Sequence, residues 1–467
     1  MGKEKKNVVD EPIYDARTLG TPKMLVLGLQ HLFAMFGATV LVPILTGLSV
    51  SATLLFAGLA TLFMHLVTKR KVPVFLGSSF AFLGGYFAVV ASGAELGLSQ
   101  AESLPYACVG VACAGLLYLI LSLICKAFGS KNVMRFFPPV VTGPIIIAIG
   151  LILAPSAINN CSSNWWIALV AIVVVIVCNI WGKGMIKIVP ILMGVLVSYL
   201  AAAVTGNVDF SGVKEAAWIG LPVQGQNTVF SLFGAENFNS GLLVSAIIMI
   251  VPIAFATMME HVGDISAIGG TIEKNLIEDP GLHRTLIGDG VGTTIAALFG
   301  APANTTYGEN TGVLVLTKVY DPKVVRLAAV YAIVLSFCPK FAALISAMPA
   351  ATIGGVSIIL YGMISAVGVR NMVENHTDFQ KSRNVIVAAV ILGLALGINF
   401  SGLLGADITT AGNNATGAIS FMIGDMKVAL SGLAVASIVG IILNAILPGK
   451  REEYMPNEEN SSSLGKF

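Results

Sequence analysis

The chain contains a succession of apolar runs of about 18–25 residues, each long enough to cross a hydrocarbon core of about 30 Å as a helix. Of its 467 residues 56% are hydrophobic and only 11% are charged, whereas about 25% are charged in a typical soluble domain. A β-barrel would show short segments of alternating polarity instead. The sequence therefore predicts an all-α, multi-pass protein of the cell membrane.

The apolar runs define fourteen candidate spans. They cover approximately residues 24–47, 50–68, 73–93, 105–125, 137–155, 164–181, 187–205, 241–262, 284–300, 303–317, 324–347, 349–369, 384–400 and 426–447. With the N-terminus inside, only Lys214, Lys340 and Lys427 fall in outer segments, and the other 24 of the 27 Lys and Arg residues fall in cytoplasmic ones. Because cytoplasmic loops are enriched in Lys and Arg, both termini are expected in the cytoplasm. Residues 450–467, rich in Glu, Asn and Ser, are expected to form a disordered tail.

Two halves of seven spans share landmarks in the same order. The matching pairs are Gln30-His31 with Glu260-His261, GSSFAF (77–82) with NTTYGE (304–309), and FPPVVTGP (137–144) with MPAATIGG (348–355). Because seven is odd, the second half enters the membrane from the opposite side. The pattern predicts two inverted seven-span repeats, a plan common among secondary transporters.

The third and tenth candidate spans are interrupted by Gly and small polar residues, at 77–82 and 304–309. A broken helix exposes backbone N–H groups, which can remain in a membrane only where they line a cavity. Interrupted segments in corresponding positions of two repeats are good sequence pointers to a binding site. We therefore predict two short antiparallel strands, one in each of these spans, each followed by a half-helix.

Few ionisable residues fall inside the spans, and each would cost several kcal/mol if it faced lipid. They are His31, Glu260, His261, Asp264, Asp289 and Glu309. Five of the six lie in the eighth to tenth spans, which indicates one polar cavity. Desolvation disfavours the charged form of a carboxyl group, so such groups can load and release a proton near neutral pH. The sequence has no Walker motif, which argues against ATP as the energy source.

The acidic residues differ in how strongly they suggest function. Glu260 and Asp264 are four residues apart and share one helix face. We expect Glu260 and Glu309 to bind a substrate or a proton rather than to be structural acids. Asp264 can be a proton relay or a helix-locking group, and Asp289 can be functional or a solvated residue near a helix end. His261 points about 100° away from Glu260 and is expected to be structural.

The other histidines and the cysteines indicate no metal chemistry. His31 can touch a substrate or brace the first span against the eighth by a hydrogen bond. His65, His283 and His376 lie at span ends or in loops and are expected to be solvated. The six cysteines form no CxxC pair, so neither a disulfide framework nor a zinc site is predicted. No cofactor and no nucleic-acid partner is expected.

Several segments carry a resemblance to a known family. They are QHLFAMFGATVLVP (30–43), LGSSFAF (76–82), EHVGD (260–264), DPGLHR (279–284), NTTYGEN (304–310) and GGVSIILYG (354–362). In this order, across about residues 20–447, they resemble the nucleobase–ascorbate transporters, with the bacterial uracil permeases as the nearest likeness. The family signature, Gln or Glu with Asn-x-Gly and, after four residues, Thr, is matched by residues 309–312 and Thr317.

The resemblance implies a division into domains. A core domain would comprise residues 24–135 (spans one to four) and 241–347 (spans eight to eleven), after a cytoplasmic N-terminal segment, 1–23. A gate domain would comprise residues 136–240 (spans five to seven) and 348–449 (spans twelve to fourteen). Family members bind substrate between the two domains, and they work as homodimers and as proton symporters.

The resemblance also implies which residues bind the substrate. Glu260 and Glu309 match two glutamates that hydrogen-bond the uracil ring. Phe80 and Gly308 match strand positions that offer backbone groups to it, and Phe80 and Tyr307 would pack on the ring.

Further positions match residues beside the site. Ala38 matches a small lining residue, and His31 matches a histidine next to the site. Asp264 stands where the best-known uracil permease has a histidine that is thought to help proton coupling. Asp289 aligns with an aspartate that xanthine transporters use, where that permease has Asn. The candidates for proton coupling are therefore Glu260, Asp264 and Asp289.

The function implied is proton-coupled import of uracil by alternating access, with Na⁺ left open as the coupling ion. Carboxylates would accept from the two N–H groups of uracil, and backbone N–H groups would serve its carbonyls. Glu309, where purine-type members usually have Gln, favours uracil, whereas Asp264 is more typical of purine members. The alternatives are a purine-type permease, an anion exchanger of the same fold, which two site carboxylates disfavour, and a membrane-embedded enzyme or sensor.

Overall fold

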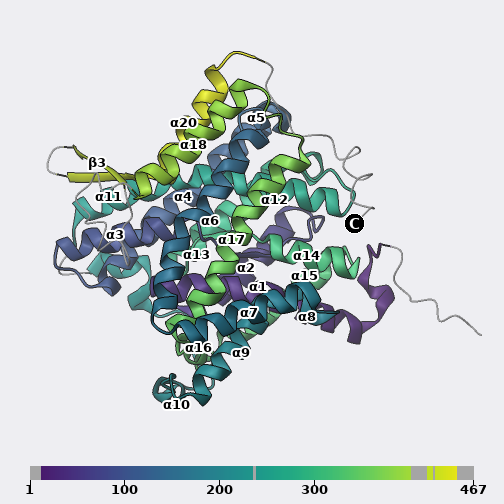
Figure 1. The fold of residues 1–467 in the computed structure, drawn as a ribbon, viewed down its shortest axis with the longest axis vertical. Coiled ribbons are helices and arrows are strands. Elements are labelled where there is room, and N and C mark those ends of the chain that lie inside the picture. Colours follow the sequence, from purple (N-terminus) through teal and green to yellow (C-terminus); the bar gives the residue numbers. More distant parts are fainter. Residues whose placement is uncertain (1–11, 235–237, 401–417, 424–425, 450–467) are drawn as a thin grey trace, which may run out of the picture.

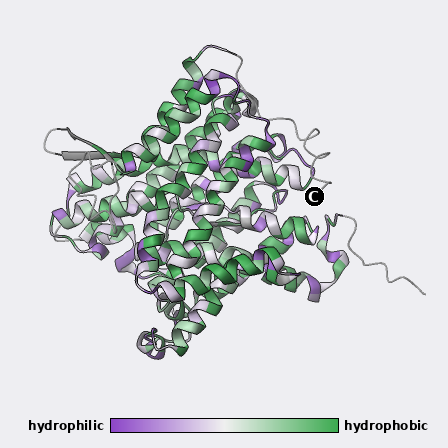
Figure 2. Cartoon of the chain, viewed as in Figure 1, coloured by the Kyte–Doolittle hydropathy of each residue, from purple (hydrophilic) through white to green (hydrophobic). Residues whose placement is uncertain are grey.

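The computed structural model describes residues 12–234, 238–400, 418–423 and 426–449. The predicted tail, 450–467, lies outside this part of the chain. Long helices cross the body of the molecule at varied angles, and α18 and α20 lie together at one edge (Figure 1). Figure 2 shows hydrophobic residues along most of the helices, with hydrophilic residues mainly at helix ends and in connecting segments.

The helices and strands follow one another along the chain, with short 3-10 or π turns denoted η. They are η1 (Ala16–Leu19), α1 (Thr21–Thr46), α2 (Val50–Val67), β1 (Leu76–Ser78), α3 (Leu83–Glu95), α4 (Gln100–Phe128), α5 (Ser130–Met134), α6 (Pro139–Ser162), α7 (Trp165–Trp181), α8 (Met185–Ile188), α9 (Pro190–Val204), α10 (Ser211–Glu215), η2 (Gly225–Asn227), η3 (Val229–Gly234), α11 (Ser240–Ile250), η4 (Val251–Ile253), α12 (Ala254–Thr271), η5 (Ile277–Gly281), α13 (Leu282–Leu298), β2 (Asn304–Thr306), α14 (Gly308–Thr317), α15 (Pro322–Ser336), α16 (Pro339–Ser346), α17 (Ala350–Glu374), α18 (Ser382–Phe400), β3 (Ala418–Ile423), β4 (Met426–Ser431) and α20 (Gly432–Ile446).

Seven helices of the described residues are long and apolar enough to cross a membrane, or eight if the bent pair α15–α16 is one span. The seven are α1, α2, α4, α6, α17, α18 and the continuous run of α11 and α12. The other candidate spans form helices of 17 residues or fewer, and two of them, the third and the tenth, contain the strands β1 and β2. The count of fourteen spans stays a prediction.

Helix α7 shows how a shorter helix can still reach both membrane surfaces. Its 17 residues rise about 26 Å, close to the thickness of the hydrocarbon core. Trp165 and Trp166 at one end and Trp181 at the other are exposed. Because Trp gathers at the two membrane interfaces, α7 has the features of a complete span.

The two short strands lie at the interrupted segments. They pair antiparallel, and the register places Leu76, Gly77 and Ser78 opposite Thr306, Thr305 and Asn304. Ser79 N donates to the carbonyl of Ala303, which extends the pairing at the Ser78 end. Helix α3 follows β1 after four residues, and α14 follows β2 after one.

The helices pack in two sets. The first contains α1, α2, α4 and α11–α15, and the second contains α6, α7, α9, α17, α18 and α20. Contacts between the sets include α12 with α6 and α20, and α1 with α9. The predicted core and gate domains would correspond to these two sets.

Two landmarks of the predicted repeat hold equivalent positions. Pro138 directly precedes α6 and Pro349 directly precedes α17, both with extended backbone. The two helices pack against each other. These positions accord with an inverted repeat, which stays a prediction.

The expectation of a helix over residues 426–447 is wrong at its start. Residues 426–431 form β4, which pairs antiparallel with β3 in a hairpin that the apolar run does not predict. Helix α20 begins only at Gly432, where the Ser431 hydroxyl accepts from the backbone N–H of Ala434. An N-cap serine of this kind marks a helix start. The apolar residues before Ser431 therefore belong to a strand and not to the helix.

Candidate functional site

The paired strands β1 and β2 lie between helices that carry the predicted site residues. Helix α1 contacts β1 and α14, and α12 contacts β2 and α14. The strands supply backbone groups near the centre of the fold, while α1 and α12 supply ionisable side chains. The structure thus brings together the eighth and tenth candidate spans with the first and third.

Asp264 is joined directly to strand β2. The Thr306 hydroxyl donates to Asp264 Oδ2 at 2.6 Å. Glu260 lies one turn earlier on the same face of α12, and both acids are half-buried. The acidic face of α12 is therefore directed toward β2 and the start of α14.

The start of α14 borders open space. Gly308 is exposed, although Tyr307 before it and Asn310 after it are buried. A Cβ atom placed on Gly308 would meet no heavy atom within 4 Å. Tyr307, the N-cap residue, makes no side-chain capping bond, so the first N–H groups of α14 are available to a ligand. Glu309 is the second residue of this helix, and its side chain lies outside the described part of the structure.

His31 braces α1 against α14. Asn310 Nδ2 donates to the carbonyl oxygen of His31 at 3.2 Å and lies 3.2 Å from His31 Nδ1. His31 is fully buried. The hydrogen bond thus joins the first candidate span to the tenth. The sequence had suggested a brace to the eighth span instead.

Tyr307 holds the two strands together. Its hydroxyl donates to the carbonyl of Ser78 at 2.9 Å, and a Cβ atom at Gly77 would come within 2.4 Å of its ring. Tyr307 is buried. Its ring therefore packs on β1, where only glycine leaves enough room.

Phe80 and Ala38 also line the strands. Phe80 is buried and packs edge-on against Tyr361 of α17, with ring centroids 5.7 Å apart. Phe80 thus links the strand region to the second helix set. Ala38 is buried in α1 beside Thr39, whose carbonyl accepts from the Ser78 hydroxyl at 2.9 Å.

A small apolar cavity lies beside Phe80. Its volume is about 30 Å³, enough for only one or two water molecules. It is lined by residues of both helix sets, including Phe80, Ala81, Ile149, Leu153, Asn399 and Leu433. The cavity therefore lies between the two helix sets.

Asp289 forms a buried pair with His261. Asp289 Oδ2 lies 2.8 Å from His261 Nδ1, and both side chains are fully buried. His261 Nε2 lies 3.0 Å from the Thr285 hydroxyl. The alternative that Asp289 is a solvated residue is therefore wrong, because α12 packs over it. Thr285 was not predicted, although its position four residues before Asp289 puts it on the same helix face.

His65 was expected to be solvated, and this prediction is wrong. It is 1% exposed, and its Nε2 lies 2.8 Å from the carbonyl of Val74. The Thr61 hydroxyl on the same helix accepts from the backbone N–H of Leu76 at 2.9 Å. Helix α2 therefore holds the entry to β1 through two polar side chains, of which Thr61 was not predicted and His65 was expected in solvent.

No group of three or more His, Cys, Asp or Glu residues in the described part of the chain could hold a metal ion. The acids and histidines occur in pairs instead, such as Asp289 with His261. What the geometry offers is a set of carboxyl groups and open backbone N–H groups around two short strands.

Comparison with known proteins assigns the chain to a family. The model of the Permease family matches residues 22–403. The uracil permease of Bacillus caldolyticus is 39% identical over 98% of this chain and 99% of its own length. The uracil permease of Escherichia coli K12 is 36% identical over 90% of each chain.

A solved structure shares the fold at low sequence identity. The transmembrane domain of the cyanobacterial bicarbonate transporter BicA has a TM-score of 0.60 and 15% identity, and the alignment covers 93% of this chain and 99% of that domain. At this identity the likeness concerns the fold alone. Together with the apolar helices, the match across residues 22–403 shows that this multi-pass membrane protein belongs to the Permease family.

Proposed function

We propose that the protein imports uracil together with a proton. The observation that carries this proposal is the hydrogen bond between Thr306 and Asp264, which sets the acidic face of α12 against the second strand and the open start of α14. The similarity to uracil permeases over nearly the whole chain supports the choice of substrate.

The chemistry of uracil suits this arrangement. The ring has two N–H donors, for which the carboxylates of Glu260 and Glu309 are acceptors, and two carbonyls, for which the N–H groups at Gly308 and the β1 backbone near Phe80 are donors. Buried polar groups that match a ligand give strong discrimination against ligands that lack the partner atoms. Tyr307 stiffens the strand pair, and Ala38 leaves room beside it.

Proton coupling would use the acids of α12 and α13. Asp264 accepts a hydrogen bond from Thr306 of β2, so a change in the protonation of Asp264 would alter its contact with this strand. Glu260 lies one helical turn from Asp264. Asp289 is linked to α12 by its contact with His261, the residue next to Glu260. Alternating access would move the two helix sets apart and enlarge the small cavity beside Phe80. The homodimer and the cytoplasmic termini belong to the same proposal.

Uptake of labelled uracil into proteoliposomes tests the function. We expect accumulation driven by an inward proton gradient, no response to a Na⁺ gradient, and weak competition by xanthine and guanine. Stronger competition by xanthine than by unlabelled uracil would favour the purine-type alternative. Asp289 supports that alternative, because it aligns with an aspartate that xanthine transporters use. Absence of uptake for every nucleobase, with bicarbonate or sulfate transported instead, would overturn the proposal in favour of an anion exchanger.

A further inference from the structure

The segment before the first span is folded against the helices that carry the two glutamates. This N-terminal strap, residues 13–19, runs beside the chain that leaves α14. Ile13 N donates to the carbonyl of Lys318 at 2.8 Å, and Tyr320 N donates to the carbonyl of Ile13 at 2.8 Å. The contact is a parallel bridge between Ile13 and Val319. The backbone just beyond the C-terminus of α14 is therefore held from outside the helix bundle.

The strap also reaches the end of α12. The Tyr14 hydroxyl donates to the carbonyl of Ile272, directly after α12, at 3.1 Å. The Tyr14 ring packs edge-on against Tyr320 with centroids 5.6 Å apart, and Lys274 Nζ lies 4.6 Å from the centre of the Tyr14 ring. A single segment thus joins the ends of the helices that carry Glu260 and Glu309.

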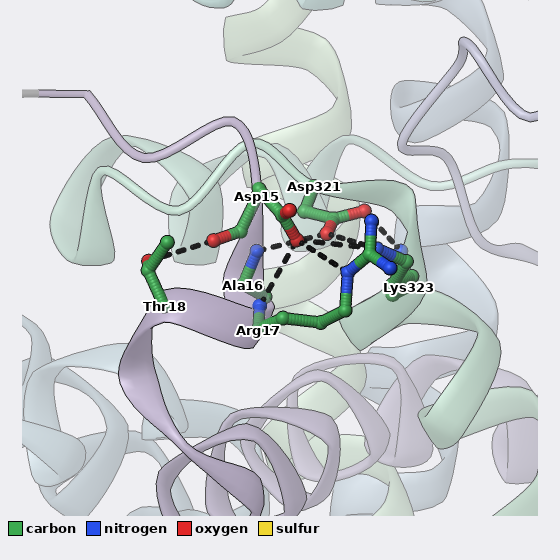
Figure 3. Close-up of polar contacts among 6 residues, drawn as sticks. All are labelled: Asp15, Ala16, Arg17, Thr18, Asp321 and Lys323. Carbon is green, nitrogen blue, oxygen red and sulfur yellow. Dashed lines mark hydrogen bonds and ion pairs between the residues drawn. The ribbon is translucent and has the colours of Figure 1, made fainter.

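Polar contacts anchor the strap at the start of α15 (Figure 3). Ala16, which is fully buried, donates its backbone N–H to Asp321 Oδ2 at 2.9 Å. The other oxygen of Asp321 accepts from the backbone N–H of Lys323 at 2.9 Å. Lys323 Nζ lies 3.2 Å from Asp15 Oδ1 and 3.4 Å from Asp321 Oδ2. Because Asp321 is only 5% exposed, these contacts are less weakened by water than those of an open surface pair.

We propose that the N-terminal strap is a positioning element for substrate binding, which sets the half-helix α14 relative to α12. Helix α14 has ten residues and is about 15 Å long, so a shift at its held end moves Glu309 and Gly308 at its other end. The inference rests on the proposed function for the ligand, but its geometric part concerns α14 alone.

Substitutions within the full-length chain test the strap. Ile13→Pro removes the N–H donor to Lys318, whereas Ile13→Val keeps it. Thr18→Ala is the matched control, because the Thr18 hydroxyl donates to the carbonyl of Asp15 within the strap. The first measurement is amide hydrogen exchange, without ligand, of Tyr307, whose N–H donates to the carbonyl of Phe75 at 3.1 Å, and of residues 312–317, whose N–H groups are bonded within α14. We expect faster exchange in Ile13→Pro and wild-type exchange in the other two variants. Unchanged exchange in Ile13→Pro overturns the proposal, whatever the substrate is.

The second measurement is uracil binding and uptake. We expect Ile13→Pro to raise the uracil Kd and KM by about threefold to tenfold, as for the loss of one hydrogen bond, with a smaller change in maximal rate. Tyr14→Phe, which releases only the α12 end, should show a smaller increase. A lower maximal rate with unchanged KM would mean that the strap is merely structural, and it would overturn the proposal. If the wild type binds no uracil while the exchange result holds, the proposed substrate fails and the positioning role stands.

Discussion

The two strand-and-half-helix segments share one architecture but differ in what they present. In the first, residues 76–95, four residues separate the strand from α3, which begins with Leu83, and Phe80 in this connection is buried against Tyr361. In the second, residues 304–317, α14 begins one residue after the strand, and its first turn contains Gly308, Glu309 and Asn310. The exposed Gly308 lies in the second segment, and the glycine covered by a ring, Gly77, lies in the first.

This difference suggests a division of labour. The first segment is enclosed by Tyr307, Thr61 and the α2 helix, so its side chains are constrained mainly by packing. The second segment carries Glu309 and the open helix start, so under the proposed function its residues are constrained by the ligand as well as by packing. Under the proposed function, both segments would offer backbone groups to the ligand, but only the second would add a carboxylate.

The largest expected effect is at the acid that distinguishes the second segment. Glu309→Gln should raise the uracil concentration for half-maximal uptake by about 10- to 100-fold, because a hydrogen bond to a charged acceptor contributes about 1.5–3 kcal/mol. Proteoliposome uptake measures this. The matched control is Gly312→Ala on the same helix, where an added Cβ meets no atom within 4 Å. Wild-type uptake by Glu309→Gln would remove the contact from the mechanism.

A matched pair of glycine substitutions separates packing from chemistry. Gly77→Ala should lower the free energy of unfolding by about 1–3 kcal/mol, because its Cβ would overlap the Tyr307 ring. Gly308→Ala should leave stability unchanged, since the position borders open space, but it should weaken uracil binding. Thermal unfolding and ligand binding on the same preparations measure both. Loss of stability in Gly308→Ala with normal binding would contradict the division of labour.

The link between Asp264 and the second strand gives a smaller effect. Thr306→Val removes the hydrogen bond to Asp264 and should lower proton-driven accumulation by about fivefold, as expected for a bond of about 1 kcal/mol. Thr305→Val is the control, because the buried Thr305 hydroxyl has no hydrogen-bond partner among the described residues.

Asp264→Asn sharpens the same test. If Asp264 carries the coupling proton, this variant should still exchange bound uracil across the membrane but should not accumulate it against a gradient. Loss of plain uracil binding would show a structural role instead.

The smallest effect concerns the ion pairs outside the membrane, one beside each segment. Hydrogen bonds from Arg17 and Lys323 lower the pKa of Asp15 from 3.8 to about 2. Lys71, near the entry to β1, likewise lowers the pKa of Asp279, with Nζ 2.6 Å from Oδ1. Because these pKa values fall on folding, the stabilisation is present above the ordinary carboxyl pKa and is lost as the pH falls toward about 2.

Asp15→Asn and Asp279→Asn measure these contributions. Each should lower the Tm slightly at pH 6, and the difference from wild type should vanish near pH 2. The effects should be small because exposed ion pairs are screened by water and salt. A difference that grows on acidification would contradict the sign.

Much of the candidate site could be chosen from the sequence because its residues are out of place in a membrane helix. Glu260, Asp264 and Asp289 stood out as acids within apolar runs, and the Gly and Thr residues around 304–309 marked the interruption. What could not be predicted was which side chains meet. The separation along the sequence between His261 and Thr285, or between Thr306 and Asp264, does not predict that these side chains form a hydrogen bond between different elements.

The sequence by itself determined that the chain is a multi-pass helical membrane protein and where its helices are interrupted, because lipid penalises every unpaired backbone group and charge along the chain. The tertiary structure alone decided that Asp289 is buried, that His65 holds the entry to β1, that β4 replaces the start of a helix, and that residues 13–19 join the ends of α12 and α14. These features depend on contacts between segments up to about three hundred residues apart, such as Ala16 with Asp321, and hydropathy along the chain carries no information about them.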